Sequence, residues 1–131
     1  MNALDTNLLV RFLVNDDLKQ AEKVKELFEE AEHSGEVFMV TSVVVQELIW
    51  VLSAVYECAR SDVLRALEQL SMLPILHFEN LVLIQRLISV GRDTTTDLPD
   101  LLIGLVAKSL GCEVTITFDR KAAQSNLFKL L

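Results

Sequence analysis

The sequence predicts an α/β domain in which a parallel sheet is covered by helices. Two observations lead to this class. The first is a set of short apolar segments typical of buried strands. The second is that longer segments, in which apolar residues recur at helical spacing, alternate with them. The length of 131 residues suits one domain and no Pro-, Gly- or Ser-rich linker divides the chain, so we expect a single domain over residues 1–131. Strands that alternate with helices pair in parallel, and ligands bind outside their carboxyl ends.

The first half of the chain is predicted to alternate strands and helices. The expected elements are a strand over residues 1–4, a helix over 6–14, a helix from Asp17 to Gly35, a strand over 37–40 and a helix that Thr41 or Ser42 caps. Asp17 followed three residues later by Gln20 resembles a capping box, and Gly35 suits a helix end. The continuous apolar run at 37–40 is typical of a buried parallel strand.

The second half is predicted to continue this alternation. The expected elements are a helix capped by Ser61 and stopped by Pro74, a strand over 75–78, a helix over 79–90, a polar loop over 91–97, a helix over 99–110 and a strand over 114–118. Proline cannot continue a helix, and Gly111 suits the end of the helix before it. In the last strand Val114, Ile116 and Phe118 alternate with threonines, as in a half-buried strand.

Four carboxylates stand at or just past the end of an apolar segment: Asp5, Glu47, Asp100 and Asp119. Asp5 and Asp119 follow predicted strands, and the other two lie in early turns of helices that we expect to begin at the same edge of the sheet. Crowded carboxylates repel one another unless a cation offsets their charge, and Mg²⁺ or Mn²⁺ prefers oxygen ligands. The sequence therefore predicts an acidic pocket for a divalent cation.

Each of these acids also has a structural explanation. Asp5 and Asp119 could cap the segments that follow them, Asp97 suits an N-cap, and Asp100 would lie favourably in a first helical turn. Only the convergence of several acids favours a metal site.

Glu47 carries the sharpest local signal. A helical projection places it among Val43, Val51 and Ala54, where a carboxylate is costly unless it finds a cation or a hydrogen bond. The alternative is a glutamate at the helix edge that reaches water.

Composition limits the possible partners. The net charge of −7 argues against a large nucleic-acid interface, because phosphate contacts need Lys and Arg. A local basic rim could still form from Arg11, Arg86, Arg92, Lys108, Arg120 and Lys121. The 51% of hydrophobic residues exceeds what an ordinary monomer needs, so we expect an oligomer. No apolar run is long enough to span a membrane and no signal peptide is recognised, so a cytoplasmic protein is expected.

Four segments resemble the PIN-domain ribonucleases, and among them the VapC-type toxins of toxin–antitoxin pairs. They are LDTNLLVRFLVNDD at 4–17, TSVVVQELIWVL at 41–52, DLPDLLIGLVAKSLGC at 97–112 and TFDRKAA at 117–123. Their order and spacing match the family over nearly the whole chain. The departures are modest: Pro99 and Leu101 flank Asp100 where small residues are more usual, and the segment RKAAQ at 120–124 lacks the aromatic residue that commonly follows the last motif.

The resemblance implies a fold, a site and an activity. The fold is a three-layer α/β/α sandwich around a short, mainly parallel sheet. The four family acids fall on Asp5, Glu47, Asp100 and Asp119, with Asp97 as an auxiliary ligand; Thr6, Asn7 and Thr117 match supporting positions, and Arg11, Arg120 and Lys121 are candidate RNA contacts. One or two Mg²⁺ or Mn²⁺ ions would support hydrolysis of RNA. The implied partners are a second copy of the chain and a small antitoxin, and the implied role is inhibition of translation.

Two other interpretations stay open. A haloacid dehalogenase type phosphatase also begins with an Asp after its first strand, but it needs a second Asp two residues later, where this chain has Asn7. A non-enzymatic interaction module on the same fold would keep the acids for capping and solubility.

Overall fold

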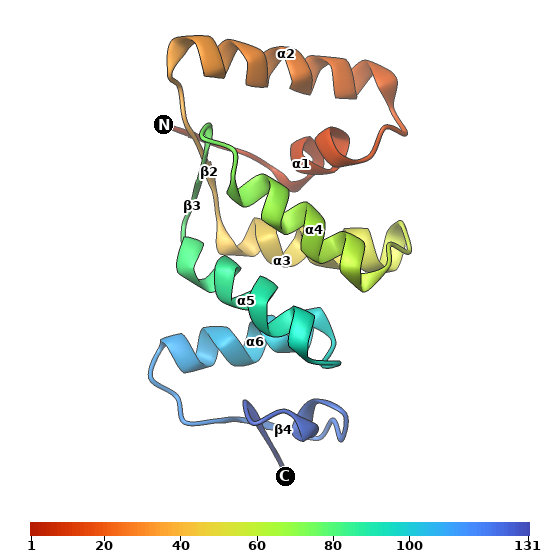
Figure 1. The fold of residues 1–131 in the computed structure, drawn as a ribbon, viewed down its shortest axis with the longest axis vertical. Coiled ribbons are helices and arrows are strands. Elements are labelled where there is room, and N and C mark those ends of the chain that lie inside the picture. The colour runs from red at the N-terminus through yellow and green to blue at the C-terminus, as the bar shows by residue number, and fades with distance from the viewer. The chain divides into compact units, whose positions relative to one another are not determined.

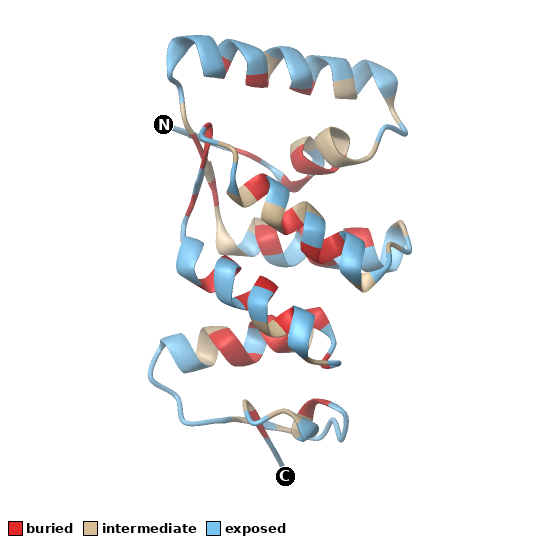
Figure 2. Cartoon of the chain, in the orientation of Figure 1, coloured by how far each residue is buried: buried red, intermediate tan, exposed pale blue.

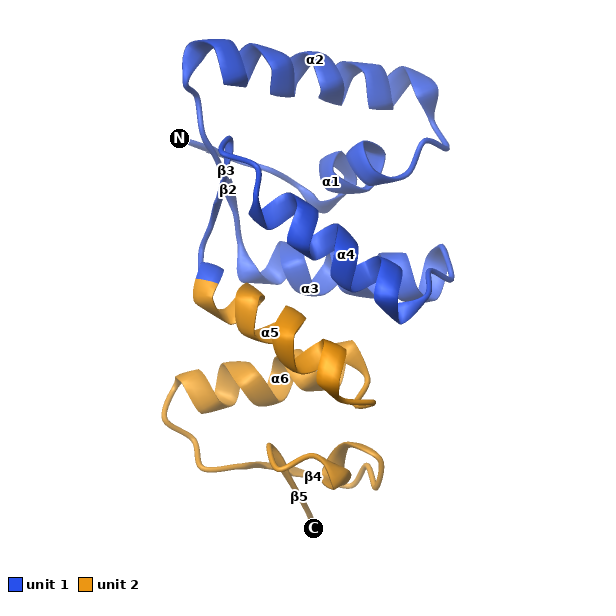
Figure 3. Cartoon of the chain, in the orientation of Figure 1, with its two compact units in different colours: residues 1–81 blue, residues 82–131 orange.

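The computed structural model describes residues 1–131 as two compact units, residues 1–81 and residues 82–131 (Figure 3). The strands within each unit pair in parallel and helices flank them (Figure 1), which confirms the predicted α/β class. The single domain expected over residues 1–131 stays a prediction. None of the helices has the length and apolar character needed to cross a membrane.

The first unit contains a three-stranded parallel sheet in the order β1-β2-β3. Its elements are β1 (Asn2–Ala3), α1 (Thr6–Leu13), α2 (Leu18–Ser34), β2 (Phe38–Val40), α3 (Ser42–Trp50), the π-helix η1 (Val51–Val55), α4 (Arg60–Ser71) and β3 (Leu76–Phe78). In the central strand β2, Phe38 lies opposite Asn2 on one side and Leu76 on the other, and Met39 lies opposite Ala3 and His77. Every strand expected in this half of the chain is present.

The helix ends of the first unit follow their local signals in most places. The side chain of Asp17 accepts a hydrogen bond from the amide of Gln20 at 3.0 Å, Gly35 ends α2 with φ 78°, and Thr41 caps α3. The predicted cap at Ser61 is wrong. Helix α4 begins at Arg60 with Ala59 in the N-cap position, two residues before Ser61, and no side chain caps it.

The core of the first unit is built from one side of each helix. Figure 2 shows that the buried residues of α2 lie along one side of the helix. Phe28 on that side makes an edge contact with Phe12 of α1 and stacks on Phe38 of β2. Helix α3 buries Val45, Leu48 and Ile49, which follow the spacing of a helical core stripe.

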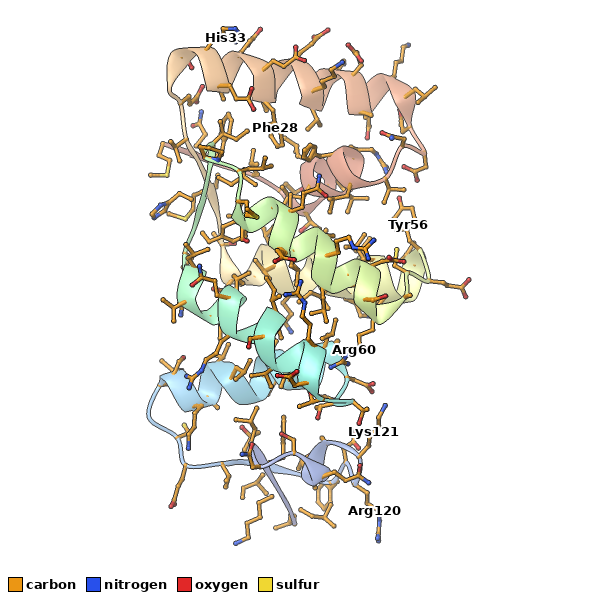
Figure 4. The ribbon with its side chains drawn as sticks, in the orientation of Figure 1. Phe28, His33, Tyr56, Arg60, Arg120 and Lys121 are labelled. Carbon is orange, nitrogen blue, oxygen red and sulfur yellow. The ribbon has the colours of Figure 1, made fainter.

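A polar network joins the end of α1 to the segment after η1. The Arg11 guanidinium donates to Asp16 at 2.9 Å, to the Tyr56 hydroxyl at 3.2 Å and to the Gln20 side chain at 2.7 Å. The Tyr56 hydroxyl in turn donates to Asp16 at 2.7 Å. Hydrogen bonding to Tyr56 and the charge of Arg11 lower the pKa of Asp16. Figure 4 labels Tyr56.

Glu79, directly after β3, closes the N-terminus of α3. Its Oε2 accepts a hydrogen bond from the backbone amide of Ser42 at 2.6 Å, and its own amide donates to the carbonyl of Val40 at 2.9 Å. The hydrogen bonds from the Ser42 amide and hydroxyl lower the pKa of Glu79 from its usual value of 4.5. A negative charge at this position also interacts favourably with the helix dipole.

We therefore expect Glu79→Gln to lower the melting temperature at neutral pH but not in acid. Because the carboxyl has a lower pKa in the folded than in the unfolded chain, its ionised form stabilises the fold above the unfolded pKa, and this contribution disappears as the pH falls through the folded pKa. Circular-dichroism melts over a pH series measure the effect. Glu30→Gln, which removes an exposed carboxylate from α2, is the control, and an equal pH-dependent difference there would contradict the assignment.

The second unit contains two helices and a two-stranded parallel sheet, against which α6 packs. Its elements are α5 (Leu81–Asp93), α6 (Leu98–Ser109), β4 (Thr115–Thr117), the 3₁₀-helix η2 (Ala122–Gln124) and β5 (Phe128–Leu130). Two corrections to the sequence predictions arise here. Helix α5 continues to Asp93 and so shortens the loop expected over 91–97, and β5 was not predicted.

Gly104 allows α6 to approach β5 closely. A Cβ atom at this position would lie 2.9 Å from Cβ of Leu127 and 2.9 Å from Cε2 of Phe128, which is closer than packed atoms tolerate. Phe128 is buried in β5, beside the strand that leads to Asp119. The glycine therefore sets the separation between α6 and the small sheet.

Candidate functional site

Asp5 stands at the carboxyl end of β1 and caps α1. Its Oδ1 accepts a hydrogen bond from the amide of Thr6 at 2.9 Å. Thr6 is buried, whereas Asp5 and Asn7 are exposed. The capping role foreseen as an alternative is thus real, but it occupies one carboxylate oxygen of an exposed side chain and is compatible with a second role.

Glu47 lies in the middle of α3 and is exposed. Its predicted apolar neighbours do not bury it: Val43, one turn earlier, is 72% exposed, and Ala54 is exposed as well. The helix turns Val45, Leu48 and Ile49 toward the core instead. The expectation of a costly buried carboxylate at this position is therefore wrong, and Glu47 is accessible on the surface of the first unit.

Three of the predicted acids gather in the second unit. Asp97 and Asp100 lie at the start of α6, and Asp119 follows β4. Burial raises the pKa of Asp100, and the charges of Asp119 and then Asp97 raise it further, while Lys121 acts in the opposite direction. The carboxylates are therefore close enough to repel one another.

Asp119 is held in place by its own turn. The Thr117 hydroxyl accepts a hydrogen bond from the amide of Asp119 at 3.0 Å, so the predicted supporting residue positions the backbone of this acid. Oδ1 of Asp119 accepts hydrogen bonds from the amides of Lys121 at 2.8 Å and Ala122 at 3.2 Å. Asp119 thus caps the turn into η2, as the structural explanation anticipated.

Asp97 does not use its side chain as a cap. It occupies the N-cap position of α6, but no capping hydrogen bond forms. Its Oδ1 instead accepts a hydrogen bond from Nζ of Lys121 at 2.8 Å. The sequence predicts Lys121 as an RNA contact and does not indicate this pair, because the two residues are 24 positions apart and no local pattern links them.

The predicted basic rim is divided. Arg120 and Lys121 lie together on the turn after β4, where Figure 4 labels both. Arg11 belongs to the first unit, and its guanidinium already donates to Asp16 and Tyr56. An RNA contact by Arg11 would have to share these hydrogen bonds, so its predicted role has the weakest support of the three.

The donor set suits a hard cation, although it is not preformed. Within neither unit do three His, Cys, Asp or Glu side chains come close enough to hold a metal ion as they stand. The chemistry nevertheless fits, because all the candidate ligands are carboxylates and the acids of the second unit repel one another in a way that a cation would relieve. Asp5 and Glu47 belong to the first unit, so the meeting of all four acids stays a prediction.

Comparison with known proteins identifies the family. The profile of the PIN domain matches residues 3–126, which is nearly the whole chain. Neither the curated proteins nor the solved structures gave a match. The matched range includes Asp5, Glu47, Asp97, Asp100 and Asp119. The chain therefore belongs to the PIN-domain family.

Proposed function

We propose that this protein is a divalent-metal-dependent endoribonuclease that hydrolyses phosphodiester bonds in RNA. PIN domains are typically metal-dependent ribonucleases. The observation that carries the proposal is the group of Asp97 and Asp100 at the start of α6 and Asp119 after β4, where burial and then the charges of Asp119 and Asp97 raise the pKa of Asp100. In a PIN domain such a group is best explained by a cation that it serves to bind.

The proposed ligands are Asp5, Glu47, Asp100 and Asp119, with Asp97 as an auxiliary ligand. One or two Mg²⁺ or Mn²⁺ ions, when bound, would supply an activated water and neutralise charge on the phosphate. The α1 cap orients Asp5, and the Thr117 hydroxyl with the following turn orients Asp119. Thr6 and Asn7 are the proposed supporting residues of the first acid, and Arg120 and Lys121 are the proposed phosphate contacts beside the second unit's acids.

We also propose that the protein is the toxin of a type II toxin–antitoxin pair, forms a homodimer, and inhibits translation by cleaving RNA. Exposed apolar side chains support a protein partner: Val43 is 72%, Trp50 56% and Val55 58% exposed, all on α3 and η1. A groove of about 710 Å³ beside α1 and α2, with Phe12 and Phe28 among its lining residues, offers a further contact surface for a small antitoxin. A cytoplasmic location is part of the same proposal.

A non-enzymatic interaction module is the second candidate. Specific observations favour it, since Asp5 and Asp119 act as caps and Lys121 neutralises Asp97, so three of the acids have structural roles. The phosphatase alternative loses its basis, because the chain belongs to a different family and carries Asn7 where the second Asp is required.

Metal binding separates the two candidates. We expect Mn²⁺ to raise the melting temperature, because a ligand that binds only the folded chain at a hundredfold excess over its Kd stabilises it by about 2.7 kcal/mol. RNA cleavage should require Mn²⁺ or Mg²⁺ and stop with EDTA. An unchanged melting temperature together with no metal-dependent cleavage would favour the interaction module.

A further inference from the structure

Lys121 reaches into the group of acids in the second unit. Its Nζ lies 2.8 Å from Oδ1 of Asp97, and the two side chains are 56% and 58% exposed. The pair joins the start of α6 to the turn after β4. A hydrated cation could therefore approach the same carboxylate that the ammonium group now contacts.

The lysine is anchored at both of its ends. Its backbone amide donates to Oδ1 of Asp119 at 2.8 Å, while its side chain donates to Asp97. The backbone of Lys121 is therefore bonded to Asp119, and its charged group is bonded to Asp97. The turn thus holds the backbone of Lys121 beside Asp119, and from there its side chain reaches Asp97.

The carboxylate of Asp97 does not cap helix α6. The N-cap position would allow it to bind an amide of α6, but no such hydrogen bond forms. The ammonium group of Lys121, 2.8 Å from Oδ1 of Asp97, therefore provides part of the positive charge that a metal ion would otherwise supply to this group.

We propose that Lys121 is an internal counter-ion that competes with a divalent cation for Asp97 and so limits metal affinity. The inference rests on the proposed function, since it concerns regulation of the same metal centre. Binding of the cation breaks the Lys121–Asp97 contact, and the released ammonium group becomes available to a phosphate of the substrate. When no metal ion is bound, the ammonium group of Lys121 reduces the repulsion among the carboxylates of this group.

The test is Mn²⁺ titration by calorimetry on the full chain. Lys121→Gln is expected to lower the Kd for Mn²⁺ by up to about fivefold, the factor that corresponds to the usual strength of an exposed ion pair. Arg120→Gln is the matched control, because it removes the same charge from the adjacent residue, which forms no ion pair. Its Kd should change much less.

A double-mutant cycle tests whether Asp97 is the carboxylate for which Lys121 and the cation compete. In an Asp97→Asn background, Lys121→Gln should give little further gain, because the competition has already been removed. Equal tightening by Lys121→Gln and Arg120→Gln, or a full gain in the Asp97→Asn background, would overturn the inference while leaving the metal centre intact. If neither the unmodified chain nor Lys121→Gln binds Mn²⁺, the proposed metal centre itself fails.

Discussion

Asp5→Asn is expected to lower RNA cleavage by more than about 100-fold, because even residues behind a metal ligand commonly contribute 10- to 100-fold. The fold should survive. Asparagine caps helices about as well as aspartate, and its side-chain oxygen can keep the hydrogen bond that Oδ1 of Asp5 accepts from Thr6. Cleavage of a labelled RNA in Mn²⁺, together with a thermal melt, measures the two properties separately.

Asp17→Asn is the matched control for this variant. Asp17 also caps a helix in the first unit, with Gln20 as the donor, but it is not among the predicted ligands. It should retain both stability and cleavage. Full activity of Asp5→Asn would remove Asp5 from the metal centre, and equal losses in both variants would show that capping, not metal binding, is responsible.

Gly104→Ala is expected to destabilise the protein, although alanine is the better helix former. The new Cβ would meet Leu127 and Phe128 at 2.9 Å, and overpacking of this kind costs about 1–3 kcal/mol, more than the about 0.5–1 kcal/mol that alanine gains over glycine within a helix. Urea unfolding measures the change. Ser109→Ala, on the exposed end of the same helix, should change stability by less than about 0.5 kcal/mol.

The same substitution should weaken Mn²⁺ binding. Gly104 lies about one helical turn after Asp100, and the strand beside Phe128 leads to Asp119. Moving α6 away from β5 would therefore move Asp100 away from Asp119. A more stable Gly104→Ala protein with unchanged metal affinity would show that the close approach of α6 to β5 is not required.

Local sequence signals predicted the elements with local causes. Asp17 and Gly35 mark the ends of α2 because the cap and the left-handed residue lie within the helix termini themselves. The apolar run that contains β2 was equally clear. By contrast, β5 has three residues and only Phe128 among them is buried, so neither length nor alternation distinguished it from a loop.

The chemistry of the candidate site was only partly readable from the sequence. The positions of the acids at element ends could be inferred, but a helical projection does not say which side of a helix meets the core, which is why the surroundings of Glu47 were mispredicted. The Lys121–Asp97 pair depends on how β4 and α6 pack, and the sequence of neither segment predicts it.

The π-helix η1 makes the spacing between α3 and Tyr56 sensitive to a single residue. The amide of Tyr56 bonds to the carbonyl of Val51, one residue farther back than in an α-helix. Deleting one residue from this turn would restore a regular helix and rotate the tyrosine by about 100° away from Asp16 and Arg11. Chain length in this segment therefore matters for the position of Tyr56: a shortened variant would lose the anchor of α1, while substitutions at the exposed Ser53 and Ala54 would keep it.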